Sequence, residues 1–305
     1  MSLLFQMGLR CIGIILLSGW VGNVGAQGLL WQAQRGNLTI FLLGSVHVCD
    51  AGCYPFAPAV QQALLASNAV ALELDAERTD IASKIEQRGF YPAGQSLRQW
   101  VSPEQAARLS RVLAEQYGKP VEPLYRMRPW LFQTVVTMYA AEKIGLNSQL
   151  GVDLKLAEMA RNQKKPVLEL ETLDEQLDML DALGEKNIGE GVAQVINVLE
   201  DTTLGINLNN LVVSWKKGNL ERLQIQVNAL MTDAERRGTF AQAMQQRNRR
   251  MVDRLVKFSQ HYQVLLAAVG SAHFLDTGNL LELLQQQGFK IRRLPTELIP
   301  AKPAT

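Results

Sequence analysis

Short apolar runs near both ends of the chain have the length and composition of buried strands. We expect strands over residues 38–43, 69–74, 166–170, 264–269 and 290–294. Continuous apolar runs of this length are typical of parallel sheets, whose strands are buried on both faces. A helical pattern over residues 58–67 joins the first two runs, which favours a strand–helix–strand unit.

Helical periodicity dominates the middle of the chain. Ser102 and Pro103 have the residue types of an N-cap and a first helical position, and Gly118 ends that helix. Further helices are expected from Arg128 to about Gly145, over 151–163, across most of 173–261 and over 280–287. This order predicts a single α/β domain, with a central mixed sheet built from N- and C-terminal segments and a large helical insertion as a cap.

The first 26 residues have the pattern of a secretory signal. Arg10 precedes the apolar run 11–17, which Ser18 and Gly19 interrupt, and small residues end at Ala26, where a signal peptidase would cleave. The alternative, an uncleaved anchor, needs about 20 apolar residues, and this run is too short. We therefore expect a mature domain over residues 27–305, located in the periplasm or secreted, with no stable membrane anchor.

Composition leaves the partner open. The 305 residues are 47% hydrophobic and 20% charged, as in an ordinary globular protein, and the formal net charge is +2. The densest basic run, Arg247, Arg249 and Arg250, is too sparse to predict a nucleic-acid surface. A peptide or small-molecule partner is expected, and the oligomeric state stays open.

Two of the three histidines end the same four-residue pattern. Gly44-Ser-Val-His47 and Gly270-Ser-Ala-His273 each follow a predicted strand. Open α/β sheets bind ligands at the carboxyl ends of their strands, so both imidazoles are expected at the functional edge. One such pattern alone is more typical of a structural histidine. The third histidine, His261, lies in a polar helix end and is expected to be solvated.

Glu73 ends the second predicted strand, where a carboxylate is costly unless it is paired or binds a cation. His47, Glu73 and His273 together form a three-ligand metal set with open positions for water or substrate. A metal held there would polarise a carbonyl and lower the pKa of its bound water. The alternative is that the same residues act as acid and base without a metal.

Three further residues are candidates for catalysis by their positions. Asp75 follows Glu73 by two residues, and Glu171 follows the predicted strand 166–170. Glu171 could equally cap the next helix. Arg128 stands at a helix start, where a cation opposes the helix dipole, which suggests that it holds a carboxylate or oxyanion. The alternative for Arg128 is an exposed side chain without a function.

Only Cys49 and Cys53 remain once the predicted signal, with Cys11, is removed. A redox pair usually has two intervening residues, and three are present here. Thiolate ligation of a metal is possible but redundant beside His273 and Glu73. An exported protein favours a disulfide that closes the loop after His47.

Several segments together resemble the TraB/GumN family, which includes the Tiki proteins of animals. They are residues 41–48, 71–75, 128–130, 151–153, 165–176, Arg247-Asn248 with Met251, and 269–274. The resemblance implies a fold shared with erythromycin esterase-like and ChaN-like proteins. In the Tiki branch it implies metal-dependent proteolysis with manganese or cobalt. The cysteine pair is not part of the family pattern.

By matching position, the resemblance implies that His47, Glu73 and His273 form the metal or catalytic set. Arg128 fits the family position before Pro-Trp, and Arg247 and Asn248 fit the Arg-Asn pair. The cofactor is expected to be a divalent metal ion, Mn, Co or Zn.

The leading hypothesis is an exported metal-dependent hydrolase that cleaves a peptide or other acyl bond. In it Asp75 or Glu171 accepts the proton and Arg128 clamps the substrate or oxyanion. One rival is a non-catalytic periplasmic protein that sequesters a peptide or haem-like ligand. Another is a metal-free esterase in which His47, His273 and Glu73 move protons.

Overall fold

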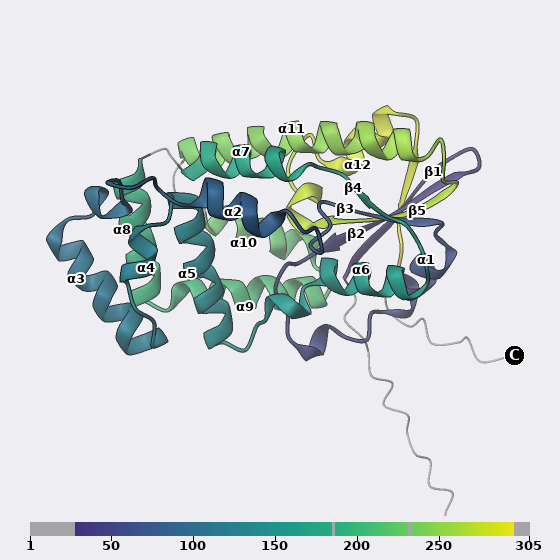
Figure 1. Cartoon of the computed structure of the whole chain (residues 1–305). Coiled ribbons are helices and arrows are strands. Elements are labelled where there is room, and N and C mark those ends of the chain that lie inside the picture. Colours follow the sequence, from purple (N-terminus) through teal and green to yellow (C-terminus); the bar gives the residue numbers. More distant parts are fainter. Residues whose placement is uncertain (1–27, 185–186, 231–233, 296–305) are drawn as a thin grey trace, which may run out of the picture.

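Among the described residues, six strands form one sheet in the order β4–β3–β5–β2–β1–β6. The computed structural model describes residues 28–184, 187–230 and 234–295 (Figure 1), so the predicted signal peptide lies outside the described residues. The strands are β1 (Leu29–Arg35), β2 (Leu38–Ser45), β3 (Ala69–Leu72), β4 (Val167–Glu169), β5 (Val264–Gly270) and β6 (Lys290–Arg293). The prediction of a mixed sheet built from both ends of the chain is confirmed.

Four neighbouring strands of this sheet, β4, β3, β5 and β2, run parallel. Ser45 of β2 lies opposite Gly270 of β5, and Leu72 of β3 lies opposite Ala268 of β5. Because parallel strands end at the same edge of a sheet, the residues that follow them meet there. The two Gly-Ser-x-His segments therefore leave adjacent strands side by side.

The apolar pattern does not reveal β1. This strand runs antiparallel to β2 through a hairpin in which Gly36 has a φ of 60°, and it pairs with β6 on its other side. Leu29, Leu30 and Trp31 are buried, but the Gln-Ala-Gln-Arg that follows them shortens the apolar run. The pairing with β2 and β6, rather than the local sequence, makes this segment a strand.

Helices cover both faces of the sheet. Figure 1 shows α1 (Pro58–Ala66) and α6 (Val152–Asn162) on one face, and α11 (Ala234–Phe258) and α12 (Leu280–Gln286) on the other. Their apolar side chains and the strands form one hydrophobic core. All four helices lie within segments that the sequence predicts as helical.

The predicted helical insertion occupies the other end of the molecule (Figure 1). It contains α2 (Ile81–Gly89), α3 (Pro103–Val112), α4 (Glu122–Tyr125), α5 (Pro129–Lys143), α7 (Leu173–Gly184), α8 (Ile188–Glu200), α9 (Thr203–Lys216) and α10 (Leu220–Leu230). Side chains such as Leu109, Phe132 and Ile196 give the insertion a core of its own. A third cluster, Trp130, Leu131, Leu173 and Leu177, lies where α5 meets α7.

The caps that the sequence predicts for α3 are present. Ser102 and Gln105 form a reciprocal capping box, and Pro103 occupies the first helical position. A π-helical turn, Leu113–Tyr117, extends α3 to Gly118, whose φ of 62° ends it.

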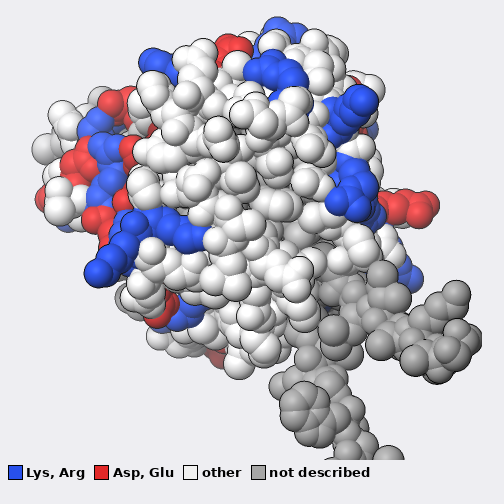
Figure 2. All heavy atoms as spheres, turned by 90° about the vertical axis from the view of Figure 1, so that its right-hand side faces the viewer, with Lys and Arg blue, Asp and Glu red and all other residues white. Residues whose placement is uncertain are grey.

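The amino ends of the parallel strands lie at the right of Figure 1, away from the insertion. Figure 2 shows this face: uncharged side chains fill its centre, and charged side chains lie mainly around its edge.

In the part of the chain that the structure describes, no helix has the length and apolar character needed to cross a membrane. Location in the periplasm stays a prediction.

Candidate functional site

Polar side chains meet at the carboxyl edge of the four parallel strands. His47 follows β2, Glu73 follows β3, Glu171 follows β4, and His273 lies in the 3₁₀ turn Ser271–Phe274 after β5. His273 Nε2 lies 3.6 Å from Glu73 Oε1. His47 Nε2 and Glu73 Oε1 both lie within 4 Å of the point that a Cβ on Gly270 would occupy. The structure therefore brings together all three residues of the predicted metal set.

Gly270 allows this close approach. A Cβ at this position would lie 3.1 Å from Glu73 Oε1, and the Gly270 backbone N–H donates to the same oxygen across 2.5 Å. The neighbouring Ser271 hydroxyl donates to the Ser45 carbonyl across 2.9 Å, which ties the ends of β5 and β2 together. The Gly-Ser pair thus holds the two histidine-bearing turns next to Glu73.

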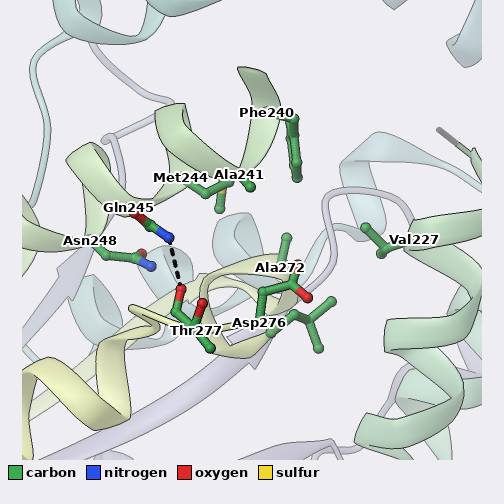
Figure 3. A pocket seen from close by; sticks show the side chains of 10 residues that line it. Val227, Phe240, Ala241, Met244, Gln245, Asn248, Ala272, Asp276 and Thr277 are labelled. Carbon is green, nitrogen blue, oxygen red and sulfur yellow. Dashed lines mark hydrogen bonds between the residues drawn. The ribbon is translucent and has the colours of Figure 1, made fainter. Parts of the chain in front are cut away.

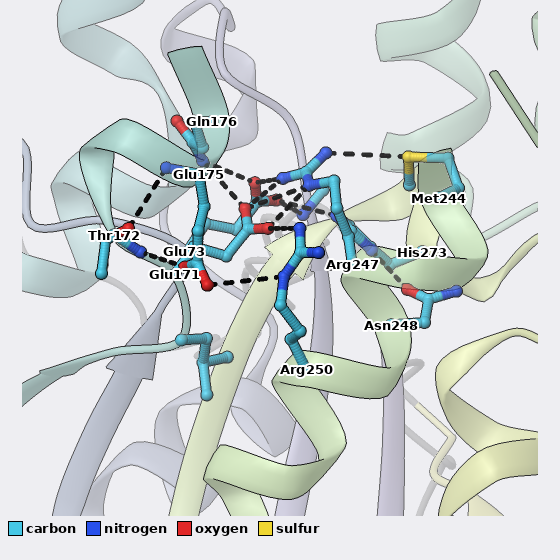
Figure 4. A network of polar contacts seen from close by, with 12 residues as sticks. Glu73, Glu171, Thr172, Glu175, Gln176, Met244, Arg247, Asn248, Arg250 and His273 are labelled. Carbon is cyan, nitrogen blue, oxygen red and sulfur yellow. Dashed lines mark hydrogen bonds and ion pairs between the residues drawn. The ribbon is translucent and has the colours of Figure 1, made fainter. Parts of the chain in front are cut away.

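Arg247 enters the cluster from α11 and pairs with two carboxylates, as Figure 4 shows. Its Nη2 lies 2.6 Å from Glu73 Oε2 and 2.5 Å from Glu171 Oε2. All three side chains are buried. Burial alone would lower the pKa of Arg247, but the two carboxylates raise it above its usual range. A buried charge needs such compensation, and Arg247 is paired with both carboxylates.

Glu171 forms an ion pair with Arg247 and does not cap α7. Thr172 and Glu175 provide the cap: the Glu175 N–H donates to Thr172 Oγ1, and the Thr172 N–H donates to Glu175 Oε2. Gln176, one turn into α7, donates to Glu73 Oε2 at 3.3 Å and to Glu171 Oε2 at 3.2 Å. The Glu171 side chain is fully buried, so it holds Arg247 and does not reach the surface.

Opposing effects act on Glu73. Burial raises its pKa, whereas the positive charges of His273 when protonated, of Arg247 and of His47, together with the Gly270 N–H, lower it. The charges and the hydrogen bond outweigh burial and hold the pKa of Glu73 below its usual range. Glu73 is therefore a carboxylate at neutral pH.

His273 is held in one tautomer by Asn248. Its Nδ1 lies 2.5 Å from Asn248 Oδ1, while Asn248 Nδ2 donates to the Gly278 carbonyl across 3.0 Å. Because the amide nitrogen is engaged by Gly278, the oxygen faces the ring, and His273 must carry its proton on Nδ1. Burial lowers the pKa of His273 to about 3, so the ring is neutral. Its buried Nε2 has no hydrogen-bond partner among the described residues and presents a lone pair beside Glu73.

His47 has an equivalent partner in Asp153, on α6. His47 Nδ1 lies 2.9 Å from Asp153 Oδ2, which leaves Nε2 as the nitrogen near Gly270. The charge and hydrogen bond of Asp153 raise the pKa of His47 above its usual range and outweigh the partial desolvation of the ring. The His47 side chain is 68% exposed, so water partly screens this effect.

Backbone contacts place Asp153 against His47. The segment before α6 pairs with the loop after β2 through two hydrogen bonds between Cys49 and Asn147, and the Val152 N–H donates to the Val46 carbonyl. A Cβ on Gly151 would lie 2.6 Å from the His47 carbonyl oxygen. Only glycine permits this approach of the two segments.

Cys49 and Cys53 are bridged by a disulfide, with their Cα atoms 6.3 Å apart. Both are buried, and because their sulfur atoms are bonded to each other, neither is available as a thiolate ligand. Asp50, between them, forms an ion pair with Lys216 of α9 at 2.5 Å. The loop after His47 is thus attached to α9 as well as to α6.

Two predicted catalytic residues lie outside the cluster. β3 ends at Leu72, so Asp75 does not continue the strand alternation and instead forms an ion pair with Arg161 at 2.5 Å. Arg128 precedes α5 and lies 3.9 Å from Asp181 of α7. Neither residue lines the cleft beside His47. The strand-end argument fails for Asp75 because the chain turns immediately after Glu73.

An open cleft of about 370 Å³ lies next to the cluster. His47, Glu73, Asp153 and Gln176 line its polar part, and apolar side chains of α2, α5 and α7 line the rest. A much smaller cavity of about 10 Å³ lies behind Asn248, between α10, α11 and the turn after β5 (Figure 3). That cavity has room for about one water molecule. Of these two spaces, only the cleft beside His47 has room for a ligand larger than water.

The nitrogen donors of this cluster suit a divalent metal ion. The neutral His273 offers an unpartnered buried lone pair, and both histidines have an acceptor on the other ring nitrogen, as metal-ligating histidines do. The Glu73 carboxylate is less available as a metal ligand, because Arg247 donates to its Oε2 and the Gly270 N–H donates to its Oε1. Within the described ranges, no three His, Cys, Asp or Glu side chains have the spacing of a metal centre.

Sequence reasoning assigned no role to Asp153 or Gln176. Both lie in segments that carry the family resemblance, at 151–153 and 165–176, and both are on helices. Their contacts with His47 and Glu73 depend on how α6 and α7 pack, which no local pattern shows. Arg247 and Asn248, which the resemblance matched to the Arg-Asn pair without giving them a role, both contact the cluster.

Comparison with known proteins identifies the family. YbaP of Escherichia coli (strain K12), an uncharacterized protein, is 27% identical over 276 residues, which cover 84% of this chain and 97% of the relative. Metalloproteases TIKI1 and TIKI2 of Danio rerio are each 23% identical and cover 88% and 91% of this chain, but it spans only 63% of either. No solved structure matches. The TraB/PrgY/gumN family model matches residues 29–293, and the chain belongs to this family.

Proposed function

We propose that the protein is an exported metal-dependent hydrolase that cleaves a peptide or another acyl bond beside His47 and Glu73. One observation carries this proposal: His47 and His273 both turn Nε2 towards the Glu73 carboxylate, while Asp153 and Asn248 hold the other ring nitrogens. Such outer partners orient metal-ligating histidines. The printed names of the two Danio rerio relatives, both metalloproteases, support the same class.

The residues divide between metal binding and positioning. His47, Glu73 and His273 would hold the ion, which would supply Lewis acidity and lower the pKa of bound water. Arg247 keeps Glu73 ionised and oriented. Hydrolysis breaks the bond from the carbonyl carbon to the leaving atom: the hydroxyl of water joins the carbon, and a proton joins the leaving group. His47 lines the cleft, with Nδ1 held by Asp153, so its Nε2 is the nitrogen available to the ion.

The direct test measures metal binding and turnover on the same protein. The protein expressed from the full chain is purified without added metal, and its metal content is determined by elemental analysis. It is then assayed on a peptide library before and after chelation, and after re-addition of Mn²⁺, Co²⁺ or Zn²⁺. The proposal expects about one equivalent of bound metal and cleavage that is lost on chelation and restored by the ion.

Histidine variants give a matched control. His273→Ala should lower metal affinity and cleavage at least about 100-fold, because it removes a ligand. His261→Ala should change neither, because His261 is exposed in the turn that follows α11. Full activity in His273→Ala would contradict the proposal. Stoichiometric peptide binding without cleavage would instead favour the binding-protein alternative.

The Arg247–Glu73 ion pair favours a second candidate, a metal-free hydrolase. Arg247 Nη2 lies 2.6 Å from Glu73 Oε2, so the carboxylate already has a counterion. In that case His47 and Glu73 exchange protons with water and the leaving group directly. Turnover by protein that contains no metal and is indifferent to chelator would select this candidate.

A further inference from the structure

The cleft beside His47 has apolar walls that the proposed chemistry does not require. Three helices of the insertion build these walls: Ile81 and Ile85 of α2, Trp130 of α5, and Leu173, Leu177 and Leu180 of α7. Ile81, Ile85 and Leu180 remain partly exposed, although other side chains of the same cluster are buried. A concave apolar surface that continues into a polar cluster is typical of a ligand site.

Ion pairs outside the cleft hold its walls in position. Lys84 of α2 lies 2.5 Å from Asp174 of α7, and Arg88 of α2 lies 2.6 Å from Asp181 and 2.8 Å from Asp178. Gly89 at the end of α2 brings this helix against α5, because a Cβ there would lie 2.7 Å from Leu131 Cδ2. The cleft therefore has fixed walls, as a preformed binding site requires.

The charges in the cleft restrict its occupant. Glu73 and Asp153 line it, whereas none of its described lining residues is Lys or Arg. The walls formed by α2, α5 and α7 carry no charged side chain, so a carboxylate or phosphate group placed against them would lose its hydration without gaining a partner. Gln176, Thr134 and Ser148 add polar side chains along the apolar wall. An uncharged chain with its own donors and acceptors, such as a peptide backbone, matches this lining.

We propose that the cleft between α2, α5 and α7 is a subsite for a large apolar side chain of a peptide substrate, next to the bond that is cleaved. This inference rests on the proposed hydrolase function. The volume of about 370 Å³ lies in the range of small-ligand pockets and accommodates one aliphatic or aromatic side chain together with adjacent backbone. Ile85, on the wall formed by α2, determines the preference for apolar groups.

The experiment uses the full chain and three fluorescent peptides that differ only in one residue, which is leucine, aspartate or lysine. Binding is measured by anisotropy, and cleavage is followed separately. We expect wild type to favour the leucine peptide by at least about tenfold in Kd and in kcat/KM. Ile85→Glu should weaken binding and cleavage of the leucine peptide and improve use of the lysine peptide, while Ile85→Leu should keep the preference for leucine. Ile206→Glu, which alters an exposed isoleucine of α9, is the matched control and should have no effect.

The two measurements separate this inference from the hydrolase proposal. Selective binding of the leucine peptide that Ile85→Glu weakens supports the subsite even if no peptide is cleaved, in which case only the hydrolase proposal fails. Cleavage with equal use of the leucine and aspartate peptides overturns the subsite and leaves the hydrolase proposal in place. The subsite is also overturned if no peptide is bound or cleaved, or if only fatty-acyl esters are hydrolysed. Circular dichroism and thermal unfolding verify that each variant is folded.

Discussion

Asn248 Oδ1 accepts a hydrogen bond from His273 Nδ1 at 2.5 Å and thereby determines which ring nitrogen faces Glu73. The second contact of the amide, from Nδ2 to the Gly278 carbonyl, prevents Asn248 from presenting its nitrogen to the ring. His273 therefore keeps a bare Nε2 in a buried position 3.6 Å from Glu73 Oε1. Asn248, on α11, thus orients the Nε2 lone pair of His273, which follows β5.

Asn248→Leu should lower metal affinity and turnover about 10- to 100-fold, because the acceptor that orients His273 is lost. Asn248→Asp keeps an acceptor oxygen and should retain more function than the leucine variant. Calorimetric titration with Mn²⁺ and Zn²⁺ measures the affinity. Gln245→Leu, on the same helix and facing Thr277, is the control for local packing. Equal affinities in the leucine and aspartate variants would show that the hydrogen bond does not position His273.

Gly151→Ala should destabilise the protein by about 1–3 kcal/mol, because its Cβ would lie 2.6 Å from the His47 carbonyl oxygen. The displacement should also separate Asp153 from His47 and reduce turnover. Gly238→Ala is the matched control: it lies in α11 with open space around its Cβ and should raise stability by up to about 1 kcal/mol. Urea unfolding measures both changes. A stability of Gly151→Ala equal to wild type would contradict the close approach.

Arg247→Met should cost about 3–5 kcal/mol of stability, because it leaves the buried carboxylates of Glu73 and Glu171 without their counterion. Adding Glu171→Leu to this variant should recover part of the loss, since one unpaired charge is then removed. Arg249→Met alters an exposed arginine of the same helix and should change stability by no more than about 0.5 kcal/mol. The free energies of unfolding of the single and double variants form the double-mutant cycle.

The Glu175–Arg254 ion pair should make stability depend on pH. The hydrogen bond from Arg254 is the main cause that lowers the pKa of Glu175 to about 2, below its unfolded value of about 4.3. The pair therefore stabilises the fold fully above about pH 4.3, and its contribution is lost as the pH falls towards 2. Glu175→Gln keeps the α7 cap and should cost about 1 kcal/mol at pH 7, since both side chains are partly exposed.

Unfolding midpoints of wild type and Glu175→Gln across this pH range provide the measurement. The two curves should approach one another as the solution becomes more acidic. A difference that stays constant from pH 7 to pH 3 would show that the ion pair is not its source. Glu77→Gln, whose side chain is 60% exposed beside Arg161, should have little effect at any pH.

Most of the sheet and the centre of the site follow from local sequence. Apolar runs predict the parallel strands, because strands buried on both faces lack polar positions. Gly44-Ser-Val-His47 and Gly270-Ser-Ala-His273 follow two such runs, and parallel pairing of β2 with β5 is enough to bring both histidines to one edge. Glu73 joins them for the same reason, at the end of β3. The family resemblance adds the Arg247-Asn248 pair.

Tertiary packing alone decides which side chains meet the strand ends. Asp153, Gln176 and Arg247 reach His47 and Glu73 from α6, α7 and α11, and the direction of a helical side chain depends on how its helix docks. Strand alternation also stops where a strand stops, so Asp75 turns to Arg161 while Glu73 stays in the cluster. The sequence by itself determined that His47, Glu73 and His273 lie at the ends of neighbouring strands, because this depends only on where the β-strands run and end. Only the packing of the helices decided which side chains contact these three residues, how the histidines are protonated and where the apolar cleft lies, because all of these arise from contacts between segments far apart in the chain.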